Sequence, residues 1–386
     1  MTIKETDQKY IMPTYGRVDL ELVSGKGAHL YDSLGKEYID FGSGIAVNTF
    51  GASDPEWVDA VYAQLKKIQH TSNYYYTEPC SSLAKLLCER TNMDKVFFSN
   101  SGAEANECAI KAARKYGTDK NPDKNIIITL KNSFHGRTVT TLSATGQDVF
   151  HKHFTPFTEG FLYVEANNTD ELVAAMNENV CGIMMEIIQG EGGVLPLTEE
   201  FIYKAKELAQ KFDALLIFDE VQTGNGRTGK LYAYQNFNIT PDIFTTAKGL
   251  AGGLPIGATV FSEKLSEILP AGSHGSTFGG NPVSAAAAVN ILSRIDDSLL
   301  SGVVSKSQKI VSSLSSLDEV DEISGIGLML GIKTKKDAKN IMKYCQDKGL
   351  LVLTAKDKVR LLPPLNISND ELEKGLDILK EAIKNA

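Results

Sequence analysis

Two short apolar stretches that end in charged residues decide the fold: residues 214–220 read ALLIFDE, and residues 243–248 read IFTTAK. Near-continuous apolar runs of this length are typical of strands buried on both faces of a sheet. We therefore predict strands at 214–218 and 243–247. Similar runs predict four more strands, at 96–99, 126–130, 183–188 and 259–262.

Segments with helical periodicity lie between these runs. In residues 103–114, small apolar side chains recur at i, i+3, i+4 and i+7, and residues 199–212 also place apolar side chains on one face. A third segment, 281–295, is rich in alanine. The alternation of strands and helices over residues 90–290 predicts an α/β domain with a mostly parallel sheet.

The two flanks have a different pattern. Residues 20–50 favour short strands joined by glycine turns, whereas residues 300–386 alternate helix, strand and helix. Two helices are expected in the second flank, at 336–348 and 369–385. We interpret these flanks as a smaller α+β domain.

Composition and charge exclude several classes of protein. The 386 residues are 42% hydrophobic and 23% charged, as in soluble globular proteins, which excludes an intrinsically disordered chain. The net charge of −8 argues against a nucleic-acid partner. The polar amino terminus has no apolar signal core, and no run of roughly 20 apolar residues could cross a membrane. We expect a cytoplasmic protein without a membrane partner.

Cysteine and histidine are not spaced for metal binding. The five cysteines are widely separated and include no C-x-x-C pair, so we expect free thiols rather than a disulfide framework or a zinc knuckle. His151 and His153 have no third ligand at a sensible spacing. We therefore expect no metal.

Residues that follow the predicted strands carry the candidate chemistry, because open α/β sheets bind ligands beyond the carboxyl ends of their strands. The segment 99–105, SNSGAEA, follows one strand and begins a helix. Exposed N–H groups and the positive helix end suit a phosphate there. The same residues also fit an ordinary helix start, with Ser101 as N-cap and Glu104 completing a capping box.

Asp219 and Lys248 follow two other strands. A buried acid is costly unless it pairs with a cation, a protonated ring nitrogen or a metal ion. Burial would lower the pKa of Lys248 and make its amine a nucleophile, although a lone lysine at a loop start is usually a surface residue. A phosphate site, an acid and a lysine after three strands of one sheet together favour a catalytic site.

One segment imitates a nucleotide-binding motif. Residues 224–230, GNGRTGK, nearly match a P-loop, and residues 215–220 resemble the strand that accompanies it. However, Leu231 stands where a P-loop needs Ser or Thr, no strand precedes the glycines, and the order of the two motifs is inverted. We exclude an NTPase.

Together these segments resemble the class III aminotransferases of pyridoxal-phosphate (PLP) fold type I, over nearly the whole chain. The motifs that carry the resemblance are YIMPTYGR (10–17), GSGIAV (42–47), TSNYYYTEP (71–79), SNSGAEANE (99–107), FHGRT (134–138), EIIQGEGG (186–193), IFDEVQTGNGRTG (217–229), TTAKGLAGGLPIGA (245–258), HGSTFGGNP (274–282) and RLLPPL (360–365). Two positions depart from the family: Ala52 replaces a usual histidine, and Ile187 a common proline. The resemblance implies a large PLP-binding domain at 61–285 and a small domain built from both chain ends, 1–60 and 286–386.

The resemblance also implies roles toward the cofactor. Lys248 would be the Schiff-base lysine and the acid/base of the proton transfer, and Asp219 would pair with the pyridinium nitrogen. The other cofactor-binding residues implied are Ser101, Gly102 and Ala103 at the phosphate, Phe134 and Val221 on the ring faces, Gln222 at the phenolic oxygen, and Thr277 at the phosphate of a neighbouring subunit. A homodimer with shared active sites follows from the last role.

Toward substrates, the resemblance implies two arginines. Arg137 would bind one carboxylate and Arg360 a second, with Glu191 as a gate that pairs with Arg360 when no second carboxylate is bound. Either arginine could instead form a structural salt bridge. Weaker candidates for shaping the substrate pocket are Tyr15, Ile45, Asn73 and Ser276. Ornithine-specific members tend to carry a bulkier tyrosine near Ile45, so an aliphatic residue there would leave room for an acyl group.

The activity implied is a ping-pong transamination of arginine biosynthesis. It would convert N2-acetyl-L-ornithine and 2-oxoglutarate into N-acetyl-L-glutamate 5-semialdehyde and L-glutamate. Alternatives within the family are succinylornithine, ornithine, 4-aminobutyrate and succinyldiaminopimelate aminotransferases. A decarboxylase of dialkyl amino acids would use the same lysine and acid, and a non-catalytic PLP reservoir would leave the arginines and the gate without a purpose.

Overall fold

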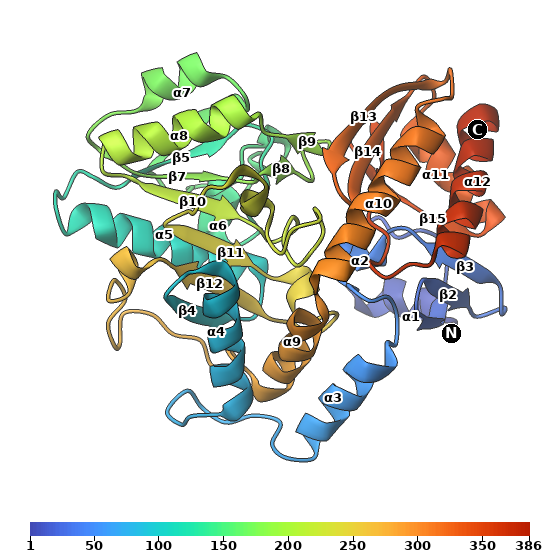
Figure 1. Ribbon diagram of the computed structural model, residues 1–386, viewed down its shortest axis with the longest axis horizontal. Helices are drawn as coiled ribbons and strands as arrows, with labels where there is room; N and C mark the ends of the chain where they lie inside the picture. Colours follow the sequence, from blue (N-terminus) through green and yellow to red (C-terminus); the bar gives the residue numbers. More distant parts are fainter.

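The computed structural model describes residues 1–386, and a seven-stranded sheet forms its centre (Figure 1). The strand order is β4-β12-β11-β10-β7-β5-β6, and only β12 runs antiparallel to its neighbours. The strands are β4 (Lys95–Ser99), β5 (Ile126–Leu130), β6 (Phe161–Val164), β7 (Val180–Met185), β10 (Leu215–Asp219), β11 (Ile243–Thr246) and β12 (Gly257–Phe261). The predicted mostly parallel α/β sheet is confirmed.

Side chains of β10 explain why the central strands are apolar throughout. Leu215 and Ile217 belong to a core cluster with α5 (Gly102–Thr118), whereas Leu216 and Phe218 belong to another with α8 (Glu199–Lys211). Successive strand residues point to opposite faces, so both sets are buried. Figure 1 shows α8 and α5 on opposite sides of the sheet.

Both chain ends contribute to a second part of the molecule. Strand β3 (Glu37–Asp40) pairs with β15 (Leu350–Leu351) in parallel, so an amino-terminal and a carboxyl-terminal strand share one sheet. This sheet also contains β1 (Leu22–Lys26) and β2 (His29–Asp32), and the neighbouring antiparallel sheet contains β13 (Val320–Ile326), β14 (Met329–Thr334), β17 (Lys358–Leu361) and β16 (Leu353–Ala355). Both sheets share one hydrophobic core cluster with helices α10 (Asp297–Leu314), α11 (Ala338–Lys348) and α12 (Asn369–Asn385).

The remaining elements connect these parts. They are α1 (Ile3–Tyr10), α2 (Ser43–Ala46), α3 (Pro55–Leu65), α4 (Glu78–Thr91), α6 (Val139–Ala144), α7 (Thr169–Ala175), α9 (Pro282–Arg294), β8 (Ile188–Gln189), β9 (Leu195–Pro196) and the short 3₁₀ turns η1 (Asp148–Phe150), η2 (Ala233–Phe237), η3 (Lys248–Leu250) and η4 (Glu263–Leu265). No helix combines the length and the apolar character needed to span a membrane.

Most predicted elements lie within two residues of those observed, and the differences have local causes. The strand predicted at 183–188 is wrong at its end: β7 stops at Met185, because the side chain of Glu186 turns to accept hydrogen bonds from Phe134 N and Gly190 N. The helix predicted at 336–348 begins at Ala338, because Asp337 caps it. Strand β6 was not predicted.

Candidate active site

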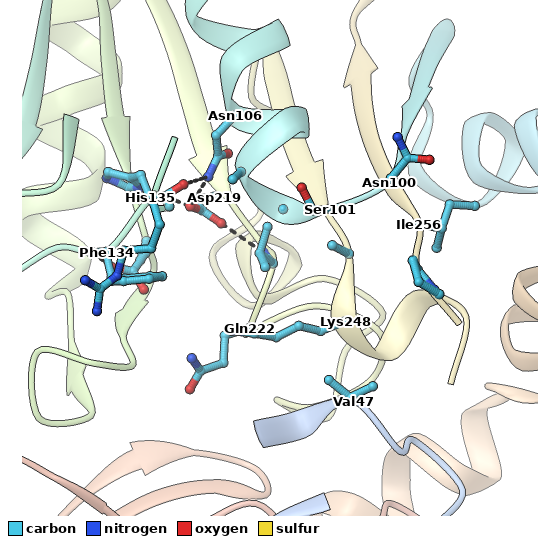
Figure 2. A pocket seen from close by; sticks show the side chains of 18 of the residues that line it. Val47, Asn100, Ser101, Asn106, Phe134, His135, Asp219, Gln222, Lys248 and Ile256 are labelled. Atoms are coloured by element: carbon cyan, nitrogen blue, oxygen red, sulfur yellow. Dashed lines mark hydrogen bonds and ion pairs between the residues drawn. The ribbon is translucent and has the colours of Figure 1, made fainter. Parts of the chain in front are cut away.

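A cavity of about 410 Å³ lies where the central strands end (Figure 2). The predicted residues that line it are Ser101, Gly102, Ala103, Phe134, Arg137, Asp219, Val221, Gln222 and Lys248. They come from four separate segments, and the sheet brings them together because β4, β10 and β11 all end at this edge. The three features predicted separately, a helix start, an acid and a lysine, therefore face one space.

Lys248 begins η3, directly after β11, and its backbone has a φ of +47°. Its side chain is half-buried and reaches the cavity. Burial lowers the pKa of the Lys248 amine, against the opposing effects of the Glu191 and Asp219 carboxylates. The lysine is therefore poised to act as a neutral amine more readily than an exposed lysine would.

Asp219 is the last residue of β10, and only 3% of its surface is exposed. Its Oδ2 accepts hydrogen bonds from Asn106 Nδ2 at 2.7 Å and from His135 Nδ1 at 2.8 Å, and its Oδ1 accepts one from Val221 N at 3.0 Å. Thr245 Oγ1 in turn donates to Asn106 Oδ1. This network fixes the orientation of the carboxylate toward the cavity, and Figure 2 shows Asn106 and His135 converging on Asp219.

The start of α5 forms another wall of the cavity. Ser101 is its N-cap, and Ser101 Oγ accepts a hydrogen bond from Glu104 N at 3.2 Å, as predicted. The predicted capping box is not formed, because the Glu104 carboxylate accepts from Asn100 N instead. The N–H groups of the first two helical residues, Gly102 and Ala103, have no partner within the helix and leave an anion site available. A Cβ on Gly102 would lie 2.7 Å from Val221 Cγ1, so glycine allows these segments to approach each other closely.

Two arginines are placed for anions in different ways. Arg137 is exposed at the cavity, forms no ion pair, and stacks on Phe150, with Cζ 3.8 Å from the ring centroid. Arg360 on β17 is 3% exposed, and its Nη1 lies 2.6 Å from Glu191 Oε1 and 3.2 Å from Gln222 Oε1. Arg360 and Glu191 do not line the cavity themselves but contact it through Gln222.

The ion pair controls the charge of Glu191. Burial alone would raise the pKa of Glu191, but the Arg360 guanidinium outweighs burial and holds the pKa below its usual value. The carboxylate is therefore ionised at neutral pH and neutralises Arg360.

The five remaining predicted residues, Tyr15, Ile45, Asn73, Ser276 and Thr277, do not line the cavity. The Tyr15 and Ile45 residues are 73% and 41% exposed. Asn73 Nδ2 donates to Ser276 O at 2.9 Å, and Ser276 Oγ accepts from Asn100 Nδ2, which belongs to a residue of the cavity wall. Val47, two residues after Ile45, lines the cavity instead.

Sequence reasoning missed three buried polar residues of the cavity wall: Asn106, His135 and Glu186. Burial, with a smaller contribution from the nearby Asp219 carboxylate, raises the pKa of Glu186 to about 7. His135 and Glu186 occur in the FHGRT and EIIQGEGG motifs, but nothing in those motifs indicates that they face Asp219. Only the packing of β7, β10 and α5 brings them there.

The sequence model of the family described as "Aminotransferase class-III" matches residues 10–383. The chain belongs to the class-III aminotransferase family. A curated class-III relative, the acetylornithine aminotransferase of Haemophilus ducreyi, is 50% identical over 99% of this chain and 98% of its own length. The succinylornithine transaminase of Citrobacter koseri is 42% identical over 97% of this chain and 95% of its own length.

Solved structures share the class-III fold. The N-acetylornithine aminotransferase of Stenotrophomonas maltophilia K279a superposes with a TM-score of 0.86 at 36% identity, covering 98% of both chains. The ornithine aminotransferase of Toxoplasma gondii superposes with a TM-score of 0.93 at 30% identity, covering 98% of this chain and 93% of that chain. That protein is described as having partial occupancy of PLP at its active site.

Proposed function

We propose that this chain is a PLP-dependent aminotransferase of arginine biosynthesis. It converts N2-acetyl-L-ornithine and 2-oxoglutarate into N-acetyl-L-glutamate 5-semialdehyde and L-glutamate. The observation that carries this proposal is that Lys248 and Asp219 face one cavity, in a chain that matches an acetylornithine aminotransferase along nearly its whole length.

The residues of the cavity fit PLP. The free N–H groups of Gly102 and Ala103, with Ser101, suit its phosphate, and Phe134 and Val221 offer apolar surfaces for the ring faces. Asp219 is oriented by His135 and Asn106 to accept a hydrogen bond from a protonated ring nitrogen. Gln222 lines the same wall and suits the phenolic oxygen.

When bound, PLP supplies an electron-withdrawing ring and an aldehyde to which amino groups are transferred. Lys248 Nζ would hold the cofactor through its aldehyde carbon and, once the substrate amine has displaced it, would move a proton between the substrate carbon and the cofactor carbon. The lowered pKa of the Lys248 amine suits both roles, because a neutral amine is the nucleophile and the proton acceptor. Asp219 maintains the positive charge of the ring nitrogen.

Two carboxylate sites allow two substrates to share the pocket. Arg137 has no ion-pair partner and binds a carboxylate of either substrate in our proposal. Arg360 is neutralised by Glu191 while acetylornithine is bound, and a carboxylate of glutamate or 2-oxoglutarate displaces Glu191. Tyr15, Ile45, Asn73 and Ser276 are proposed to border the substrate in the assembled enzyme.

We also propose a homodimer, with Thr277 reaching the phosphate in the partner's site. Tyr74 and Tyr76 are almost wholly exposed, and Phe278, beside Thr277, is 59% exposed. Such a group of exposed aromatic side chains is typical of an interface. The enzyme is proposed to be cytoplasmic.

The resemblance to the family suggests a large PLP-binding domain at 61–285, with 1–60 and 286–386 forming the small domain. Because α9 (Pro282–Arg294) contributes to the core of the large sheet, we place the second boundary after Arg294.

Succinylornithine is the second candidate donor, because a 42% identical relative carries that name. Ornithine, 4-aminobutyrate and succinyldiaminopimelate are less favoured alternatives, and a dialkyl amino acid decarboxylase would release CO₂. A panel of these donors, added singly to the PLP-loaded protein, separates the alternatives. We expect acetylornithine to change the visible absorbance of the cofactor fastest. No change with acetylornithine, beside a rapid change with another donor, would reassign the substrate.

Replacement of the proposed catalytic amine provides the second test. Lys248→Ala should abolish multiple turnover, because no other lysine lines the cavity. Retained multiple turnover in this variant would refute the role of Lys248.

A further inference from the structure

The backbone of Lys248 adopts a conformation that requires external support. Its φ of +47° lies in the left-handed region, which is unfavourable for any residue with a Cβ. Ala247 before it is also unusual, with φ −162° and ψ −142°. Such conformations persist only where the surrounding structure fixes them. Together they end β11 and direct the Lys248 side chain into the cavity.

Two buried side chains hold the carbonyl groups on either side of Lys248. Asn225 Nδ2 donates to Ala247 O at 3.2 Å, and Thr49 Oγ1 donates to Gly249 O at 2.8 Å. Asn225 is 3% exposed and Thr49 is 1% exposed, so water does not compete for these bonds. The two residues come from distant parts of the sequence, and their hydrogen bonds fix the backbone immediately before and after Lys248.

There is little space between Gly249 and the side chains of Thr49 and Asn225. A Cβ on Gly249 would lie 2.8 Å from Thr49 Oγ1 and 3.4 Å from Asn225 Cβ. Asn225 Nδ2 also lies 3.2 Å from Thr246 Oγ1, which fixes its amide group. Asn225 belongs to the glycine-rich segment 224–230, which imitates a P-loop and has no role in the proposed reaction.

We propose that Asn225 and Thr49 are positioning residues that clamp the Lys248 backbone in its left-handed conformation and so hold its amine in the cavity. Neither residue lines the cavity, so neither would touch substrate or cofactor. The proposal rests on the proposed function in one respect, that Lys248 Nζ is the reacting amine.

The clamp has a consequence for the reactivity of the amine. Burial lowers the pKa of the Lys248 amine. Of the charged groups around it, Arg360 also lowers this pKa, whereas Glu191, Asp219 and Glu186 raise it. A loosened backbone would let the amine reach water, so its pKa would rise toward the ordinary value and less neutral amine would exist at pH 7. Uptake of PLP by the apo protein would then become slower at pH 7.

The test compares Thr49→Val, which keeps the shape but removes the donor, with Thr49→Ser, which keeps the donor. Asn225→Ala is the second variant. The rate of PLP uptake by each apo protein is followed across pH by absorbance. We expect Thr49→Val and Asn225→Ala to take up PLP about fivefold more slowly at pH 7, because a smaller fraction of the Lys248 amine is neutral when its pKa rises. Thr49→Ser should behave as the wild type.

Thr91→Val is the matched control, because Thr91 is also buried and its Oγ1 donates to a carbonyl, Leu87 O, at 2.6 Å in α4. It should leave the pH profile unchanged. In the holoenzyme, kcat of both half-reactions should fall by a similar factor in Thr49→Val, with KM unchanged, because Lys248 serves both.

An unchanged pH profile in Thr49→Val and Asn225→Ala would overturn the clamp, as would an equal shift in Thr91→Val. If Thr49→Val does not fold, the profile of Asn225→Ala decides the outcome. Failure of the wild type to transaminate any donor would refute the proposed function instead. The PLP-uptake profiles would still show whether the clamp sets the reactivity of Lys248.

Discussion

Glu191→Gln tests the proposed gate, because it removes the charge of Glu191 while nearly preserving its shape. In the structure, Glu191 Oε1 lies 2.6 Å from Arg360 Nη1, and the Arg360 side chain is only 4% exposed. Any carboxylate that binds Arg360 must first displace Glu191. Without the negative charge, this competition weakens and the buried guanidinium is left without its counter-ion.

The size of the effect follows from the exposure of the pair. A hydrogen bond between charged groups contributes about 1.5–3 kcal/mol. The Glu191 side chain is 33% exposed, so the lower end of that range applies. Because 1.36 kcal/mol corresponds to a factor of ten, we expect KM for 2-oxoglutarate to fall about tenfold. The kcat/KM for acetylornithine should fall by a similar factor, because its acyl end would face an unpaired cation.

The assay measures each half-reaction separately by the visible absorbance of the cofactor. Glu322→Gln is the matched control, because Glu322 pairs at 2.9 Å with Lys358, a buried cation on the same strand as Arg360. Glu322→Gln should leave both KM for 2-oxoglutarate and kcat/KM for acetylornithine unchanged. If Glu191→Gln changes the two half-reactions equally, or raises KM for 2-oxoglutarate, Glu191 does not gate Arg360.

Three further predictions concern the cofactor pocket and the framework around it. Gly102→Ala should raise the Kd for PLP about tenfold, because its Cβ would lie within 2.9 Å of both Val221 methyl carbons. The control Gly302→Ala should leave the Kd unchanged, because only Lys306 Nζ lies within 4 Å of its Cβ, and equilibrium dialysis measures the Kd of both variants. Asp219→Asn should lower kcat at least 100-fold while the protein still binds PLP, because a neutral amide does not maintain the charge of the ring nitrogen; a fall in kcat of less than tenfold would remove Asp219 from the mechanism. Asp54→Ala should lower the free energy of unfolding by about 2 kcal/mol at pH 7, because Asp54 both caps α3 and pairs with Arg294. Trp57, the one tryptophan, lies in the same helix, and its fluorescence follows unfolding in urea. Burial alone would raise the pKa of Asp54, but Arg294 holds it below the ordinary 3.8. The stabilisation is therefore present above pH 3.8 and is lost as the pH falls through the lowered pKa. If the difference in unfolding free energy between wild type and variant does not shrink there, the ion-pair contribution is contradicted.

The central sheet could be predicted from the sequence because its strands are buried on both faces. Residues 214–218 and 243–247 carry no charged side chain, whereas a strand or helix with one face in water would place polar residues at regular intervals. Strand β6 escaped prediction because its four residues, FLYV, lie at the sheet edge, where two are half-buried and one is exposed. The pairing of β3 with β15 joins residues more than 300 positions apart, and no local pattern encodes such a contact.

The site was predictable to the extent that its residues follow strands. Asp219 and Lys248 follow from strand ends, and resemblance to the family supplied the arginines and Glu191. The residues that orient Asp219, Asn106 and His135, were not predicted, because their roles depend on how α5 packs on the sheet. The clamp on Lys248 was also invisible, because Thr49 and Asn225 meet η3 only in three dimensions.

The most direct measurement locates the bond between protein and cofactor. The PLP-loaded protein is reduced with borohydride, digested and analysed by peptide mass spectrometry. Our account predicts that the cofactor is attached to the peptide that contains Lys248, and that N2-acetyl-L-ornithine added before reduction prevents this attachment. Attachment to a different lysine, or to none, would contradict the central claim.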